Sequence, residues 1–269
     1  MITLGLAFAG LAGTFVSMYL FTGAGIGWSV FASLVAFLAV QGGLSAFFLK
    51  RIKADMLAVQ KVVAEGQKAV EAKTRAWQFR PPGSVQEAQR IIAEDMRAAV
   101  RKALDETARL EKYRPWVLFV SRQIATARLH LNWMIKDFKA VDAEMPRALL
   151  LDAVSLSMKM ARLQMLDAPL GEIEKVYDKA VARARYNDNV LPAACWSWIL
   201  VQRGETDRAF KALTQALKKS DNETLKKNHE ALMNNRVLHF NNSGLGDQWY
   251  ALHLEEPKIR QQRPRSAYR

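Results

Sequence analysis

Residues 1–49 contain no Asp, Glu, Lys, Arg or His, and the first charged side chain of the chain is Lys50. As one helix this stretch would measure about 70 Å, more than twice the ~30 Å hydrocarbon layer of a bilayer. The glycine-rich sequence Thr22–Gly27 interrupts it and leaves an apolar segment long enough to cross a bilayer on each side. The sequence therefore predicts a two-helix transmembrane hairpin over residues 1–49, with spans at 2–21 and 28–49.

Small residues recur at four-residue steps along one face of the first span. Such a stripe lets another helix backbone approach closely. We expect it to pack against the second span, and a contact between copies of the chain is the alternative. The four residues are Gly5, Ala9, Gly13 and Ser17.

A cleaved signal peptide is the alternative interpretation of the first span. Signal peptides begin with positive residues and have an apolar core of about 7–15 residues. This chain has no Lys or Arg before Lys50, and its apolar run is longer. We therefore expect the span to be retained.

The orientation of the hairpin follows from the basic residues that flank it. Lys50, Arg51 and Lys53 come directly after the second span, while the turn carries no charge. Basic flanks stay in the cytoplasm and attract anionic lipid, so we expect both termini to be cytoplasmic and these three side chains to contact lipid. The only cysteine, Cys195, excludes an intramolecular disulfide and suits a reducing compartment. We expect the membrane to be the inner membrane of a bacterium, an inference that rests mostly on the compact architecture of the chain.

The remainder of the chain is strongly basic, because all 39 Lys and Arg and all 26 Asp and Glu lie beyond residue 49 and give a net charge of +13. Such a charge suits nucleic acid, anionic lipid or an acidic protein. The predicted anchor favours lipid. Nucleic acid ranks below it because the sequence has no nucleic-acid-binding motif.

Residues 50–83 read as a basic continuation of the second span. Apolar residues recur there with the spacing of a coiled-coil seam. This helix either self-associates as a stalk or lies on the bilayer or on its own domain. The seam comprises Ile52, Met56, Val59, Val63, Gly66, Val70 and Trp77.

Pro81-Pro82-Gly83 should end this helix, and Ser84 with Glu87 fits a capping box that starts the next one. We place the main domain boundary here. Residues 84–256 then form a helical domain without convincing strand alternation, and residues 257–269 form a basic tail.

Within the domain we expect one helix to begin at Pro115 and continue towards Met145. We also expect a final helix at 247–254, which would cover the open end of the array with Trp249, Tyr250 and Leu254.

Two helix pairs at about residues 155–220 carry small residues where helices must approach closely. Their spacing resembles the tetratricopeptide repeat (TPR) family, whose pattern covers about 34 residues. The family tryptophan is missing from its usual place, and Arg185 and Asp221 replace the terminal prolines. The matching positions are Ser157, Met160, Ala161, Gln164, Ile173, Tyr177 and Ala180 in the first unit and Ala193, Trp196, Ser197, Leu200, Gly204, Ala209, Leu213 and Ala216 in the second.

The resemblance implies a TPR-like solenoid whose inner face binds a protein partner. An ordinary array of helical hairpins is the alternative. On this interpretation the groove would present Met158, Arg162, Met165, Trp198, Val201 and Gln202. The order of parts, a two-helix anchor followed by TPRs, is similar to that of the TPR components of Pel exopolysaccharide secretion machineries.

The sequence offers no sign of catalysis. His130, His229, His239 and His253 are not at metal-ligand spacing, and Cys195 lies in an apolar helical pattern typical of an inert thiol. We expect no catalytic, cofactor or metal site.

We therefore predict an all-α, membrane-anchored scaffold or adaptor that binds protein partners and membrane lipids. Self-association through the transmembrane or juxtamembrane helices is a further possibility. Two alternatives stay open: a membrane-tethered protein that binds nucleic acid or anionic lipid, and a non-catalytic subunit of a membrane enzyme or secretion complex.

Overall fold

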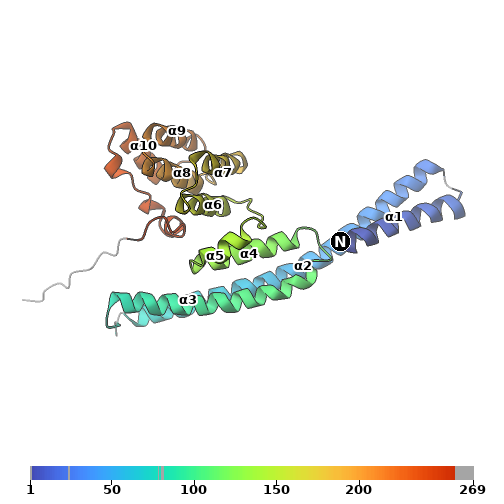
Figure 1. The fold of residues 1–269 in the computed structure, drawn as a ribbon. Helices are drawn as coiled ribbons and strands as arrows, with labels where there is room; N and C mark the ends of the chain where they lie inside the picture. The colour runs from blue at the N-terminus through green and yellow to red at the C-terminus, as the bar shows by residue number, and fades with distance from the viewer. Residues whose placement is uncertain (1, 24, 78, 80–81, 258–269) are drawn as a thin grey trace, which may run out of the picture. The chain divides into compact units, whose positions relative to one another are not determined.

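The computed structural model describes residues 2–23, 25–77, 79 and 82–257. Every regular element in these ranges is a helix, which confirms the predicted all-α class. The chain divides into two compact units, residues 1–149 and 150–269. The first contains helices α1 to α5 and the second α6 to α11, as Figure 1 labels them.

Unit 1 begins with the predicted hairpin. Helix α1 spans Ile2–Phe21 and helix α2 spans Ile26–Ala76. Gly23 in the turn has a φ of 63°, a conformation that glycine adopts without steric cost. By length and composition both helices can cross a membrane. The two helices pack against each other, and Thr3 and Ala7 of α1 and Ser29 and Ser33 of α2 are buried.

The predicted stripe of small residues does not lie in this contact. Gly5, Ala9, Gly13 and Ser17 are all exposed, and a Cβ at Gly5 or Gly13 would meet nothing within 4 Å. A Cβ at Gly10, in contrast, would lie 3.6 Å from Val40. The expectation that the stripe packs against the second span is therefore wrong. Both faces of α1 are rich in small residues, and their spacing does not show which one meets α2.

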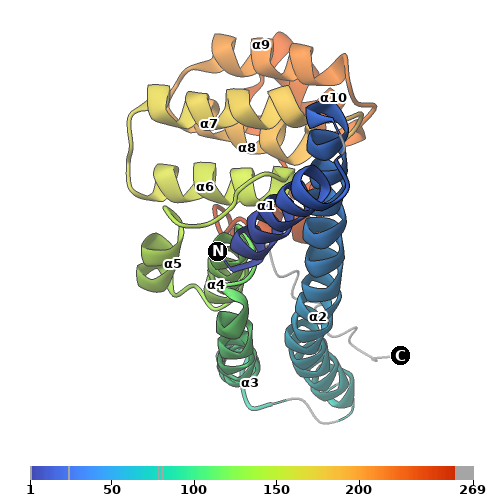
Figure 2. The ribbon, with the colours of Figure 1, turned by 90° about the vertical axis from the view of Figure 1, so that its right-hand side faces the viewer.

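Beyond its apolar half, α2 continues without a break and lies antiparallel to α3 (Val85–Thr107), as Figures 1 and 2 show. Ile52 and Val59 of the predicted seam are buried in apolar clusters within unit 1. Of the alternatives for this segment, the structure shows the helix packed on its own domain.

The boundary expected near residue 83 is a turn within unit 1. Pro81 lies outside the described residues, whereas Pro82 and Gly83 are non-helical. The Ser84 hydroxyl accepts a hydrogen bond from the Glu87 amide at 3.1 Å, which caps α3 as predicted. Because α3 packs back along α2, the division between compact units falls instead at residues 149 and 150.

The helix predicted to begin at Pro115 begins later. After α3 comes the 3-10 helix η1 (Ala108–Tyr113), and α4 spans Val120–Met134. Helix α5, Phe138–Glu144, is separate because Lys136 has a φ of 58°, which interrupts the helix, and Asp137 caps the new one. Residues 114–119 form a connecting segment of turns rather than the first residues of α4.

Unit 2 is an array of antiparallel helices, stacked as shown in Figure 2. Helix α8 packs against α6, α7 and α9, and α9 packs against α10. The small residues expected at close helix approaches are buried, among them Ser157, Ala161, Ala180, Ser197 and Ala209. The five helices are α6 (Ala153–Met165), α7 (Leu170–Arg183), α8 (Val190–Gln202), α9 (Thr206–Leu217) and α10 (Glu223–Met233).

Three short elements follow: η2 (Val237–His239), η3 (Ser243–Leu245) and α11 (Asp247–Tyr250). The final helix expected at 247–254 is therefore a single turn. The basic tail predicted at 257–269 lies outside the described residues apart from Pro257.

Candidate interaction surfaces

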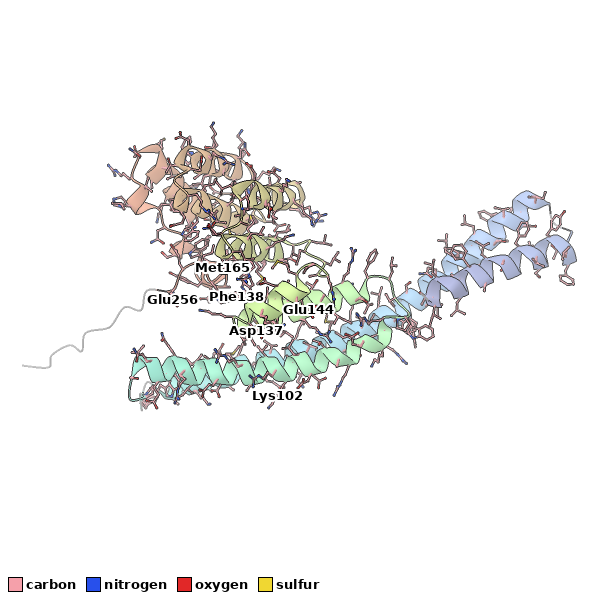
Figure 3. All side chains as sticks on the ribbon, in the orientation of Figure 1. Lys102, Asp137, Phe138, Glu144, Met165 and Glu256 are labelled. Atoms are coloured by element: carbon pink, nitrogen blue, oxygen red, sulfur yellow. The ribbon has the colours of Figure 1, made fainter. Side chains whose placement is uncertain are left out.

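The groove residues predicted in unit 2 come from α6 and α8, which pack against each other. Met158 is buried, whereas Arg162, Met165, Trp198 and Val201 are half-buried and Gln202 is exposed. Figure 3 places Met165 at the end of α6. The C-terminal segment, residues 237–256, contacts α8 at Trp198 and so occupies part of the predicted groove.

A shared carboxylate fixes this C-terminal segment on α8. The indole nitrogens of Trp198 and Trp249 donate to the two oxygens of Glu255, at 2.8 and 2.7 Å, and the two indole rings lie 5.9 Å apart. Trp249 and Leu252 are completely buried. Trp249 therefore covers α8, in the middle of the array, rather than its open end as expected.

Buried amides attach the same segment at a second place. The Asn228 side chain donates to the Asn242 amide oxygen at 2.7 Å, and the Asn242 side chain donates to the Ala194 carbonyl at 3.1 Å. Buried polar groups linked in this way specify one arrangement of the backbone. The C-terminal segment is thus attached to α8 at Ala194 as well as at Trp198.

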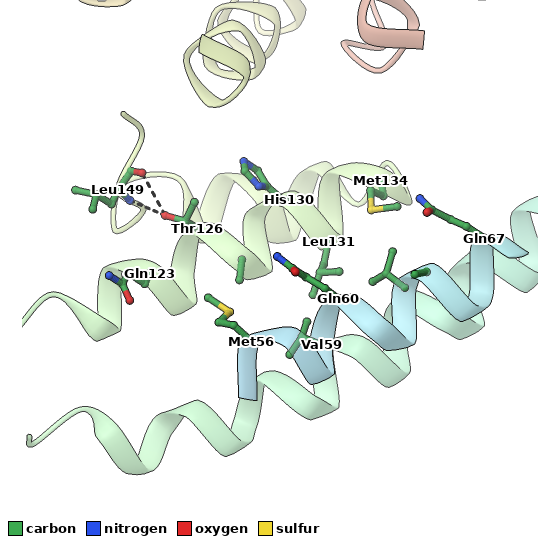
Figure 4. Close-up of a pocket in the computed structure, with 13 residues that line it drawn as sticks. Met56, Val59, Gln60, Gln67, Gln123, Thr126, His130, Leu131, Met134 and Leu149 are labelled. Carbon is green, nitrogen blue, oxygen red and sulfur yellow. Dashed lines mark hydrogen bonds between the residues drawn. The ribbon is translucent and has the colours of Figure 1, made fainter. Parts of the chain in front are cut away.

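An open apolar groove lies instead in unit 1, between α2 and α4 (Figure 4). Its volume is about 460 Å³. Met56, Val59 and Val63 of the predicted seam form one wall, and residues of α4 form the other. The remaining lining residues are Gln60, Ala64, Gln67, Gln123, Thr126, Ala127, His130, Leu131, Met134 and Leu149.

None of the 13 described lining residues is Asp, Glu, Lys or Arg. The backbone amide of Leu149 donates to the Thr126 hydroxyl at 2.8 Å, which holds residue 149 against α4 at the edge of the groove. An apolar surface with a few amide groups suits an uncharged, largely apolar occupant.

Basic residues lie at the end of the apolar part of α2, as the sequence predicts. Lys50, Arg51 and Lys53 are all exposed. The guanidinium carbon of Arg51 lies 4.4 Å from the centre of the Phe47 ring. This arrangement places a cation beside the last apolar turn of the helix.

Burial makes two titratable groups of unit 2, Cys195 and Tyr177, poor nucleophiles. Cys195 is completely buried, and this burial raises the pKa of its thiol. Burial also raises the pKa of Tyr177 to about 12. Among the described residues, no group of three or more His, Cys, Asp or Glu side chains could hold a metal ion.

Comparison with known proteins identifies no relative: no family model, curated protein or solved structure matches the chain.

Proposed function

We propose that the chain is a membrane-anchored scaffold or adaptor that recruits or assembles a protein complex at the cytoplasmic face of a bacterial inner membrane. One observation carries the proposal: an open, uncharged apolar groove on α2 and α4, in the same unit as two helices able to cross a bilayer. Apolar surface that stays open in a soluble region marks sites of protein association.

The orientation and the repeat family belong to the same proposal. The basic flank at Lys50, Arg51 and Lys53 supports a cytoplasmic location for both termini. The paired helices α6 to α9, with small buried residues at their contacts, support a TPR-like array. Because the C-terminal segment contacts α8 at Trp198 within the predicted inner face of unit 2, the partner surface we favour is the groove of unit 1.

The groove can be tested with a single charge. Ala64 is an exposed residue that lines the groove, so Ala64→Glu adds a carboxylate there without disturbing the core. Ala69→Glu places the same charge on an exposed position of α2 outside the lining set. If the groove binds a partner, Ala64→Glu should weaken binding at least about tenfold because the charge would be desolvated without a counterion.

The measurement is affinity capture of the full chain from detergent-extracted membranes, with quantitative mass spectrometry of both variants and the wild type. A protein that is recovered in stoichiometric amount with the wild type and Ala69→Glu, and lost with Ala64→Glu, would support the scaffold. Recovery of that protein with Ala64→Glu would contradict binding of the partner in the groove. Recovery of lipid or nucleic acid alone would favour a membrane-tethered protein that binds lipid or nucleic acid.

A further inference from the structure

The segment Arg114–Phe119 lies beside the end of the apolar hairpin. The backbone amide of Ile2 donates to the Pro115 carbonyl at 2.8 Å, and the buried Thr3 hydroxyl donates to the Trp116 carbonyl. These bonds hold the segment at the first turn of α1, as Figure 1 also shows near the start of the chain.

The same segment contacts α2 at the level where its apolar half ends. The Trp116 ring stacks on Phe48 with centres 5.1 Å apart, and the Tyr113 ring lies 6.2 Å from Phe48. Lys50, the first charged residue, follows two positions later. The segment therefore lies where both apolar helices would leave the hydrocarbon layer.

Two large apolar side chains of this segment are exposed. Leu118 is 47% exposed and Phe119 is 50% exposed. Phe119 also has a φ of 65°, in the left-handed region that is rare for an aromatic residue. Strained backbone of this kind persists where the surroundings hold it, and it clusters at functional sites.

Basic residues border these apolar side chains. The Arg122 guanidinium lies 5.6 Å from the Phe119 ring centre, and Arg51 lies over Phe47. Two acids near the segment are paired with bases, Glu111 with Arg114 at 2.9 Å and Asp55 with Lys112 at 3.0 Å. Aromatic residues with Arg at the edge of an apolar region are typical of the membrane interface.

We propose that residues 116–119 insert into the headgroup layer of the bilayer that the hairpin crosses and bind its anionic lipids as a second membrane contact. The proposal rests on the membrane-spanning hairpin. The segment adjoins the ends of α1 and α2, so a molecule that binds Leu118 and Phe119 would also contact the lipid headgroups beside Phe48. This position favours a lipid surface over a protein partner.

The test measures the depth of a fluorescent label on the full chain in vesicles of phosphatidylcholine and phosphatidylglycerol. An environment-sensitive dye is attached at Leu118→Cys. Matched labels at Leu38→Cys, within the apolar half of α2, and at Ala98→Cys, an exposed position of α3, report the acyl region and water respectively. Cys195 is completely buried, so the wild type treated with the dye gives the background.

We expect bromine-labelled lipid to quench the dye at position 118, and iodide in the water to quench it severalfold less than the dye at position 98. If lipid and iodide quench the dye at position 118 to the same extent as the dye at position 98, while lipid quenches the dye at position 38, the segment does not enter the headgroup layer. The hairpin would still cross the bilayer in that case. If the dye at 38 is also quenched by iodide, the membrane-spanning hairpin itself fails.

A photo-crosslinker in place of Phe119 gives a second measurement that keeps an aromatic side chain. In Phe119→benzoylphenylalanine, irradiation in the same vesicles should give lipid adducts that mass spectrometry detects. Irradiated protein without lipid adducts would overturn the proposal.

Discussion

At the scale of single residues, Gly66 sets the distance between α2 and α3. A Cβ at this position would lie 2.3 Å from the Cβ of Ala99, far inside normal contact. Alanine is about 1 kcal/mol better than glycine within a helix, but overpacking costs about 1–3 kcal/mol. We expect Gly66→Ala to destabilise the protein, and its thermal midpoint in detergent to fall by about 2–4 °C per kcal/mol.

The control moves the methyl group to the other helix. In the double variant Gly66→Ala/Ala99→Gly the contact regains its space, so a double-mutant cycle should give a favourable coupling energy. Strictly additive effects of the two substitutions would show that this contact does not limit the packing of α2 on α3.

Asp55 makes unit 1 sensitive to acid. Partial burial opposes its charge, but hydrogen bonds from Lys112 and Tyr113 outweigh this and lower the pKa of Asp55 below its ordinary value. A carboxyl with a lowered folded-state pKa stabilises the fold above its unfolded pKa, and this contribution is lost as the pH falls through the folded pKa. We therefore expect Asp55→Asn to lower the thermal midpoint at neutral pH by about 2–4 °C or less.

Acidification distinguishes this effect from a general loss of packing. The midpoints of wild type and Asp55→Asn should converge as the pH falls through the lowered folded-state pKa of Asp55, where the wild-type carboxyl also becomes protonated. A difference that stays constant from neutral pH to acid would mean that the charge of Asp55 contributes nothing.

At the scale of elements, Glu255 holds the C-terminal segment on α8 by accepting from two indoles. In Glu255→Gln one oxygen is replaced by an amide donor, which cannot accept from an N–H group. The loss of one hydrogen bond to a charged group should cost about 1.5–3 kcal/mol. We expect faster proteolysis at residues 237–256, with the exposed neighbour substitution Glu256→Gln as the unaffected control.

If Glu255→Gln and Glu256→Gln are cleaved at the same rate as the wild type, the carboxylate of Glu255 is not needed, and burial of Trp249 and Leu252 together with the buried amides of Asn228 and Asn242 holds the segment.

The elements that the sequence predicted well are those defined by local pattern. Absence of charge identified the two apolar spans, and the Ser84 cap marked the start of α3. Helical periodicity likewise identified Ile52 and Val59 as apolar contact positions. These signals are local because the hydrophobic spacing and the cap are each contained in a few turns of chain.

Features that depend on tertiary contacts were missed. Pro115 is a good first residue for a helix, but the following residues pack against Phe48 and the start of α1, so α4 begins at Val120. The groove was missed for the same reason, since its second wall is α4. No local pattern indicated that Glu255 would meet Trp198, 57 residues away in sequence.

At the scale of the whole molecule, the distribution of charge decides the proposed topology. The apolar hairpin has a charge-free turn, and the basic flank begins at Lys50. A cysteine at Thr22→Cys, in the turn, should therefore react from outside the cell, and one at Ala54→Cys should react only after the membrane is opened. Cys195 provides little background, because it is completely buried and burial raises the pKa of its thiol.

The measurement is labelling of intact and permeabilised bacterial cells with a membrane-impermeant maleimide. Reaction of Ala54→Cys in intact cells would reverse the proposed orientation and place the groove of unit 1 outside the cytoplasm. If both cysteines react only after permeabilisation, the apolar helices do not cross the bilayer. The exposed apolar side chains of α1 and α2, such as Phe8 and Leu38, would then need a protein surface to cover them.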